Sequence, residues 1–443
     1  MPVRPSSPAR PSASAPSWSP RRTLRGALAL ALVAGLGGTL LGCSAVDEAD
    51  AAVPAGRSEP VSPAPTTAEL ARLAQRAADS GSLGVIVRVD RGSGKPVEIA
   101  RQTAWTREDH RLAPGDQFRV GSNTKTMVAT VVLQLVAEGR VKLTDPVEKW
   151  LPGVVPGGRD ITLTMLLDHT SGLGDFLFAP EFLPSMIGQD ERTWTPRELL
   201  AITPAQEPPA TPGEKHFYSN ANYIALGMVV EKATGRSLAE VIEERITKPL
   251  GMKDTFLATD ARWDPEKKHA AGYEPGPARL GRILAEYGLP EGTGFAGPER
   301  PDDNVDTTGL DSGWSGAAAG MVSTARDWQR FLTALDTGKL LSGAQLRQMR
   351  TTVPAPDSGG GYGLGVMRVD TVCGTVWGHT GSLPGYSSEI YTDGTGRRGV
   401  AVLTATNFGV KEPKAAAANK ALTDAAVCAM LGKPVPAGAP AHD

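Results

Sequence analysis

The sequence predicts an α+β protein in which one lobe combines an antiparallel sheet with flanking helices from both termini, and an all-helical lobe is inserted between the two halves. Strand-like runs occupy only the two ends of the body, which we place at residues 67–433, and helical patterns fill the middle. The runs at each end are short and separated by turn residues, as in a meander. With 443 residues, 40% hydrophobic and 21% charged, the chain is long enough for one large domain or two modest ones.

The chain begins with the pattern of an export signal, which we assign to residues 1–42. Arg21, Arg22 and Arg25 precede an uncharged run rich in Ala, Leu and Gly that ends at Cys43. Small and apolar residues before a lone cysteine resemble a bacterial lipoprotein cleavage site, so we expect Cys43 to be lipidated. An uncleaved anchor or a cut elsewhere is the alternative, and the arginine pair also permits twin-arginine export. We therefore expect a lipoprotein on the outer face of the cytoplasmic membrane, or a secreted protein.

Two segments flank the body, and the body's hydropathy and the chain's net charge argue against two classes of protein. Residues 43–66 are rich in Ala, Pro, Ser and Glu and are expected to form a disordered tether, while residues 434–443 form a tail. The body contains no run of 18 apolar residues, which argues against an integral membrane protein. A formal net charge of -2 gives no electrostatic case for binding nucleic acid.

Each element of the body follows from a local pattern. Thr67, Leu70 and Leu73 predict a capped helix over residues 67–80. Strands are predicted at 83–89 and 97–102, then at 362–369, 375–380, 387–391 and 399–404. Further helices are predicted at 226–236, 237–248, 325–336, 342–350 and 412–432.

Ser122 and Lys125 lie three residues apart, on one face of a long apolar helix that runs to Gly139. A serine hydroxyl needs a base before it acts as a nucleophile. A lysine can serve as that base if an apolar environment lowers its pKa. Because Ser-x-x-Lys is short enough to occur by chance, its meaning depends on the motifs that follow.

Two later motifs carry groups that complement this pair. Tyr218 and Asn220 form Tyr-x-Asn; a phenol beside a lysine ammonium is expected to have a depressed pKa and to shuttle protons. The run His379-Thr380-Gly381-Ser382 is expected on a strand, where neighbouring glycines permit close approach of another backbone. A strand edge of this kind can bind an extended peptide, although a solvated histidine on an edge strand is the simpler interpretation of this run alone.

Taken in this order and spacing, the three motifs resemble the Ser-x-x-Lys, Ser-Asp-Asn and Lys-Thr-Gly signature of serine β-lactamases and penicillin-binding proteins. The Tyr-x-Asn form is similar to that of class C β-lactamases and low-molecular-weight D,D-peptidases, and His-Thr-Gly to that of secreted D-alanyl-D-alanine carboxypeptidases. Residues 166–173 and 316–324 also resemble family segments. The resemblance implies the β-lactamase/D,D-peptidase-like fold over roughly residues 67–433.

This resemblance also implies an acyl-enzyme mechanism. Ser122 would be the acylated nucleophile, Lys125 the general base for acylation, and Tyr218 the proton relay to the leaving amine and to the deacylating water. His379 and Thr380 would help to bind the substrate carboxylate and complete the proton network. The remaining substrate-binding candidates are Asn220, Gly381, Ser382 (whose N–H would form the oxyanion hole with that of Ser122), Trp314 (a cleft wall or an ordinary core aromatic) and Arg368.

One position bears directly on the substrate. Carboxypeptidases that the chain resembles hold the C-terminal carboxylate with an arginine on the strand before His-Thr-Gly. Arg368 is close to that place, but side chains alternate along a strand and Met367 is the alternative for the inward face. We predict a D-alanyl-D-alanine carboxypeptidase that acts on peptidoglycan peptides and is acylated by penicillins. The alternatives are a β-lactamase or small-ester hydrolase on the same fold, and a penicillin-recognising sensor lipoprotein without turnover.

The remaining cysteines and histidines set expectations for cross-links and cofactors. With Cys43 lipidated, Cys373 and Cys428 form an even pair in an oxidising compartment, which predicts a disulfide; two separate buried thiols are the alternative. The histidines show no metal-binding spacing, so we expect neither a metal nor a cofactor. The expected partners are a small cell-wall peptide and β-lactams, with membrane attachment through the lipid alone, and we expect a monomer.

Overall fold

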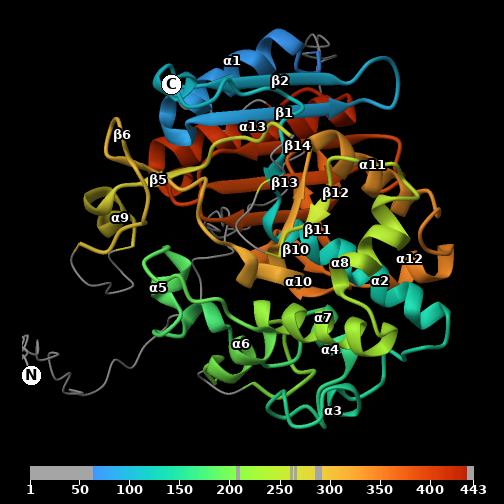
Figure 1. Ribbon diagram of the computed structural model, residues 1–443. Coiled ribbons are helices and arrows are strands. Elements are labelled where there is room, and N and C mark those ends of the chain that lie inside the picture. Colours follow the sequence, from blue (N-terminus) through green and yellow to red (C-terminus); the bar gives the residue numbers. More distant parts are fainter. Residues whose placement is uncertain (1–62, 206–209, 260–262, 264–266, 285–291, 437–443) are drawn as a thin grey trace, which may run out of the picture.

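Strands from both ends of the body share one antiparallel sheet (Figure 1). The computed structural model describes residues 63–205, 210–259, 263, 267–284 and 292–436. The predicted signal with Cys43, nearly all of the tether and most of the tail therefore lie outside the described residues. The strand order is β2-β1-β14-β13-β12-β11-β10-β9, so β1 from the N-terminal end pairs with β14 from the C-terminal end. This arrangement confirms the predicted α+β architecture.

The sheet strands agree closely with the sequence pattern at most positions. They are β1 (Gly84–Asp90), β2 (Val97–Gln102), β9 (Val353–Ala355), β10 (Gly360–Tyr362), β11 (Met367–Thr371), β12 (Gly374–Leu383), β13 (Tyr386–Thr392) and β14 (Gly399–Thr404). Two three-stranded sheets accompany it, formed by β3 (Phe118–Arg119), β8 (Met321–Ser323) and β4 (Phe256–Leu257), and by β5 (Tyr273–Pro275), β7 (Asn304–Asp306) and β6 (Glu299–Arg300).

One predicted strand was wrong. Residues 362–369 do not form a single strand, because the chain turns between β10 and β11. Gly363 N–H bonds the carbonyl of Val366, while Gly365 N–H bonds the carbonyl of Leu167 in the helical lobe. Because these backbone N–H groups form hydrogen bonds outside the sheet, the strand pairing is interrupted there.

Helices cover both faces of the sheet (Figure 1). α1 (Thr67–Ala77) and α13 (Pro413–Leu431) bury alternate valines of β1 and β14 on one face, and α2 (Thr124–Ala137), α7 (Asn220–Thr234) and α11 (Ala325–Asp336) share the core on the other. The other helices are α3 (Val147–Trp150), α4 (Leu163–Leu167), α5 (Leu183–Met186), α6 (Pro196–Ile202), α8 (Leu238–Ile242), α9 (Pro277–Ile283), α10 (Gly316–Ala319) and α12 (Gly343–Met349). In the part of the chain that the structure describes, no helix has the length and hydropathy needed to cross a bilayer.

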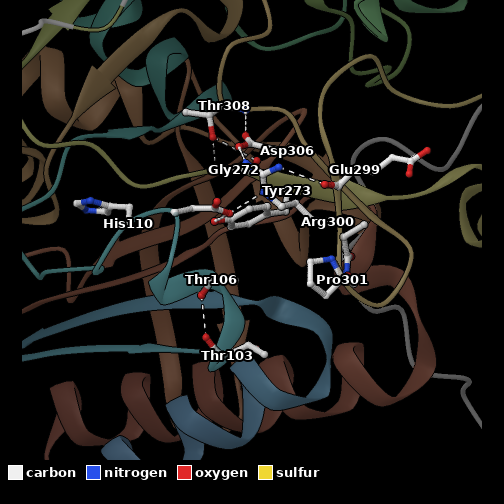
Figure 2. Close-up of polar contacts among 12 residues, drawn as sticks. Thr103, Thr106, His110, Gly272, Tyr273, Glu299, Arg300, Pro301, Asp306 and Thr308 are labelled. Atoms are coloured by element: carbon white, nitrogen blue, oxygen red, sulfur yellow. Dashed lines mark hydrogen bonds and ion pairs between the residues drawn. The ribbon is translucent and has the colours of Figure 1, made fainter.

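The small sheet β5-β7-β6 is tied to the loop after β2 by a cluster of polar side chains (Figure 2). Arg300 bonds Asp109 at 2.8 Å and Asp306 at 3.1 Å, and the hydroxyl of Tyr273 donates to Asp109 at 3.0 Å. The adjacent Glu274 is fully buried and accepts four hydrogen bonds, from the backbone N–H groups of residues 385, 407 and 408 and from one threonine hydroxyl. These contacts fix the turn between β12 and β13.

The predicted disulfide is present between Cys373 and Cys428. It joins the β11–β12 turn to α13, with a Cα–Cα distance of 5.3 Å and a sequence separation of 55 residues. Closing a loop of this length removes unfolded-state entropy worth about 4 kcal/mol. The cross-link therefore anchors the strand that leads into His379.

Candidate active site

Ser122 lies in a single turn of 3₁₀ helix, Gly121–Asn123, that leads directly into α2. Two contacts hold this turn against β13: Asn123 donates to the hydroxyl of Ser388 at 2.9 Å, and that hydroxyl donates to the carbonyl of Val120 at 2.9 Å. The turn is therefore fixed by the sheet and not only by its own helix. Ser122 itself is half-buried, so its hydroxyl remains within reach of a ligand.

Lys125 is fully buried one turn after Ser122. Its Nζ lies 3.1 Å from Ser122 Oγ, 2.8 Å from Asn220 Oδ1 and 2.9 Å from the carbonyl oxygen of Ala318. Burial lowers the pKa of Lys125 to about 7, against an opposing effect from the carboxylate of Asp175. Near neutral pH a large share of Lys125 is thus a free amine whose lone pair can take the proton of Ser122.

Asp175 is a member of this group that the sequence did not reveal. Its buried carboxylate accepts from Asn220 twice, from the backbone N–H at 2.9 Å and from Nδ2 at 2.8 Å, and from the N–H of Leu177 at 3.0 Å. A carboxylate only accepts and an ammonium only donates, so the amide of Asn220 has one orientation, with its oxygen toward Lys125. The local signal, an aspartate before a short helical turn, indicates a cap and says nothing of residue 220.

Tyr218 is held between the nucleophile and an aromatic cluster. Its hydroxyl is hydrogen-bonded to Ser122, and its ring lies 4.7 Å from Lys125 Nζ and 4.2 Å from the ring of His169. Burial raises the pKa of Tyr218, which contradicts the depressed pKa expected from the nearby lysine. Because desolvation outweighs the hydrogen bond with Ser122, which lowers the pKa, Tyr218 is a neutral phenol that can pass a proton but does not act as a phenolate base.

His379 is buried and neutral. Its Nδ1 lies 2.5 Å from the carbonyl oxygen of Thr380 and its Nε2 lies 2.8 Å from the hydroxyl of Tyr362. A carbonyl only accepts, so we assign the proton to Nδ1, which leaves Nε2 to accept from Tyr362. Burial lowers the pKa of His379 to about 3. In this state His379 offers neither a positive charge nor a spare N–H to a substrate carboxylate.

The second half of β12 lies against the Ser122 turn. Pairing with β11 ends at Met367 and Gly378, so the strand from His379 to Leu383 pairs only with β13 among the described strands. Glycines make the close approach possible: a Cβ at residue 121 would lie 2.5 Å from the backbone nitrogen of Ser382. This packing brings the backbone nitrogen of Ser382 close to the Ser122 turn.

Adding a methyl group at Gly381 is expected to damage this arrangement severely. A Cβ there would lie 2.0 Å from the carbonyl oxygen of Val120, so the strand and the Ser122 turn must separate. Losing one oxyanion donor typically costs 10²–10³ in rate, so we expect Gly381→Ala to lower kcat/KM for p-nitrophenyl acetate by about 100-fold or more. Gly115→Ala, whose Cβ meets nothing within 4 Å, is the matched control. Near-native activity in Gly381→Ala, with the fold checked by circular dichroism, would contradict the close approach.

The structure does not bring Arg368 into this group. Its side chain forms an ion pair with Asp370 at 2.7 Å, its one polar contact among the described residues. Met367 instead contacts the motif, since the hydroxyl of Thr380 lies 3.8 Å from its Sδ. The register explains the outcome: Met367 pairs with Gly378 and Arg368 with Trp377, and neighbouring side chains point to opposite faces.

Trp314 and His169 lie in the core around the site. Trp314 is half-buried and packs against Phe182, with ring centroids 5.0 Å apart. His169 is buried and its Nδ1 meets the side chain of Asn222 at 2.9 Å. Across the described residues, no group of three or more His, Cys, Asp or Glu side chains is arranged to hold a metal ion.

Comparison with known proteins shows to which protein family the chain belongs. A family model described as beta-lactamase matches residues 70–425, which is most of the chain. The chain belongs to the β-lactamase family. A solved structure of a D-stereospecific amidohydrolase from Streptomyces sp. is similar, with a TM-score of 0.65 and 35% identity over 78% of this chain and 95% of that one.

Curated proteins that resemble this chain are named for different activities. Esterase EstB from Burkholderia gladioli is 34% identical over 268 residues, which is 56% of this chain and 66% of the esterase. The D-alanyl-D-alanine-carboxypeptidase/endopeptidase AmpH of Escherichia coli K12 is 32% identical over 188 residues, 40% of this chain and 46% of that protein. The matches thus span about half to two thirds of these relatives. They support a hydrolase of the β-lactamase family and leave its substrate to be argued from the site.

Proposed function

We propose that the protein is a serine hydrolase that forms an acyl-enzyme on Ser122 and cleaves amides and esters of D-amino acids without requiring a carboxylate beyond the scissile bond. The observation that carries this proposal is that no cationic side chain among the described residues contacts the hydroxyl of Thr380. Its hydroxyl contacts Met367, and the neighbouring His379 is neutral. Similarity to a D-stereospecific amidohydrolase and to an esterase supports the same substrate class.

In the proposed mechanism every proton has a donor and an acceptor. The free amine of Lys125 takes the proton of Ser122 as Oγ bonds to the substrate carbonyl carbon. The backbone N–H groups of Ser122 and Ser382 hold the resulting oxyanion. The tetrahedral intermediate collapses and the bond to the leaving nitrogen or oxygen breaks, while Tyr218 gives its proton to that atom and takes one from the Lys125 ammonium, which becomes a free amine again. Water then attacks the acyl carbonyl carbon and passes its proton through Tyr218 to Lys125. The bond between that carbon and Oγ breaks, the acid leaves, and Lys125 returns the proton to Oγ, which regenerates Ser122.

A D-alanyl-D-alanine carboxypeptidase is the second candidate. The unpaired edge of β12 beside Ser122 suits an extended peptide, and the hydroxyl of Thr380 can donate to a carboxylate. Similarity to AmpH supports this candidate. In either case we propose export and lipidation at Cys43, and a single-chain enzyme that acts on small cell-wall peptides or related amides.

Substrate comparison separates the two candidates. A site that pairs a substrate charge discriminates strongly against analogues without it, because its own polar groups are then left unpaired. We expect kcat/KM for a D-Ala-D-Ala peptide to exceed that for its C-terminal amide by less than about threefold, with ready turnover of p-nitrophenyl acetate. Arg368→Ala should leave the ratio unchanged. A preference for the free acid of about tenfold or more would reject the amidase and esterase proposal and favour the carboxypeptidase. Persistence of a labelled penicillin adduct, followed by mass spectrometry, then distinguishes a sensor from a β-lactamase.

A further inference from the structure

We propose that a second site, remote from Ser122, binds a polyanion that carries phosphate groups. The site is a cavity of about 530 Å³ formed by β1, α11, the β13–β14 connection and the segment after α8. Its lining includes one carboxylate, Asp90, and six cationic side chains: Arg88, Arg326, Arg330, Lys339, Arg397 and Arg398. The inference is independent of the proposed hydrolase activity.

The positive charge of this cavity is only partly neutralised. Arg88 and Arg326 both form ion pairs with Glu98, and the Arg326–Glu98 distance is 3.3 Å. Arg330 forms an ion pair with Asp327 at 3.4 Å. In the described structure, Lys339, Arg397 and Arg398 have no carboxylate partner within 4.0 Å; Arg398 donates to the carbonyl of Leu431 at 2.8 Å. Six cations therefore face three carboxylates, those of Asp90, Glu98 and Asp327, which leaves an excess of three positive charges.

One residue that lines the cavity also carries a buried donor that has no partner among the described residues. Gln329 lines it, is 5% exposed, and accepts a hydrogen bond at its Oε1 from Nε of Arg88 at 2.7 Å. Because a guanidinium only donates, this contact fixes the oxygen and aims the amide nitrogen elsewhere. That Nε2 is buried and has no hydrogen-bond partner among the residues that the structure describes. Leaving a buried N–H group unpaired costs free energy, so a ligand oxygen that accepts a hydrogen bond from Gln329 Nε2 would remove that cost.

The cavity is distinct from the catalytic group. Its lining includes Thr392 and Gly399, which pair with each other at one end of β13 and β14. Ser382 lies opposite Ser387, five residues along β13 from Thr392. At about 3.4 Å per residue this is a separation of about 17 Å along the strand. A ligand in this cavity would leave Ser122 accessible.

Phosphate is the anion that this arrangement suits best. Guanidinium groups present parallel N–H donors that match two oxygens of one phosphate, and five of the six cations are arginines. A single carboxylate would leave most of the excess charge unmatched, whereas a ligand with several phosphates would match it. Phosphodiester polymers of the cell surface and headgroups of anionic lipids share this chemistry.

The test uses the purified protein and two probes. Inorganic tripolyphosphate, titrated calorimetrically at low salt, represents a soluble ligand, and co-sedimentation with vesicles of phosphatidylglycerol and phosphatidylcholine represents a lipid surface. We expect the wild type to bind at least one probe, more weakly as salt rises. Lys339→Ala/Arg397→Ala should weaken that binding at least tenfold, and Gln329→Leu should weaken it without changing the net charge.

A charge-matched variant controls for nonspecific attraction. Lys142→Ala/Lys232→Ala removes two exposed cations from the helical lobe and should bind like the wild type. Both double variants should hydrolyse p-nitrophenyl acetate within about twofold of the wild type, which verifies the fold. Selective loss of tripolyphosphate binding supports a soluble phosphate ligand, and selective loss of vesicle binding supports a lipid headgroup. Failure of the wild type to bind either probe, or equal losses in the two double variants, would overturn the proposal.

Discussion

Replacing Ser122 with alanine is expected to abolish both acylation and turnover. The hydroxyl of Ser122 lies 3.1 Å from Lys125 Nζ and is bonded to Tyr218, so it is the nucleophile that both proton-transfer groups contact. Removing a serine nucleophile typically costs about 10⁴–10⁶-fold in kcat, because the oxyanion donors and binding contacts that remain supply only part of the acceleration. We expect kcat/KM for p-nitrophenyl acetate to fall by at least about 10⁴-fold.

Peptide mapping checks the same prediction independently. After incubation with a fluorescent penicillin or the activated ester, the acyl group should be found on the peptide that contains Ser122 and be absent from Ser122→Ala. Ser382→Ala is the control, since it keeps the backbone N–H proposed for the oxyanion and should retain activity within about tenfold. Undiminished labelling of Ser122→Ala, or label on another peptide, would reject the assignment.

The sequence predicted the fold well because most elements follow from local patterns. Strands such as β1 and β14 and the capped helix α12 appear where alternation and capping residues place them. The strand predicted at 362–369 failed for a non-local reason, since Gly365 bonds a carbonyl almost two hundred residues earlier in the chain. No local pattern could report that contact.

The residues of the candidate site also fall into those that local motifs predicted and those that depend on contacts distant in the sequence. Ser122, Lys125, Tyr218 and Asn220 were found because their motifs have a characteristic order and spacing, and the structure brings all four together. Asp175 was missed because its contact with Asn220 joins residues 45 positions apart, with a 3₁₀ turn and the helices α5 and α6 between them.

The choice between Met367 and Arg368 depended on the register of β11 against β12. A shift of one residue would exchange the two side chains between the faces of the sheet, so composition and alternation could not decide it. The state of His379 was equally inaccessible, because its neutrality follows from burial beside Tyr362.

Replacing Lys125 with methionine is expected to lower kcat/KM by about 10²–10⁴-fold, because a positioned general base contributes about that much and methionine fills a similar volume without a basic nitrogen. The wild type should lose activity as pH falls through about 7, where burial places the pKa of Lys125 and protonation removes the base. This acid limb of the pH–rate profile should be absent from Lys125→Met, because the variant lacks the titrating amine. A wild-type profile that is flat between about pH 5 and 9, or a Lys125→Met variant that keeps the limb, would show that another group is the base.

Asp175→Asn provides the sharper test, because it predicts the direction in which the pH dependence of kcat/KM shifts. The Asp175 carboxylate favours the ammonium form of Lys125 and so raises its pKa; without that charge burial acts unopposed and the pKa falls. The acid limb of kcat/KM should therefore move to lower pH, while the rate at high pH, where Lys125 is already a free amine, should fall by less than about tenfold. A purely structural role for Asp175 would lower the rate at every pH and leave the limb in place. Movement of the limb to higher pH would contradict the arrangement in which Asn220 links Asp175 to Lys125, because losing a nearby negative charge lowers the pKa of Lys125 and does not raise it.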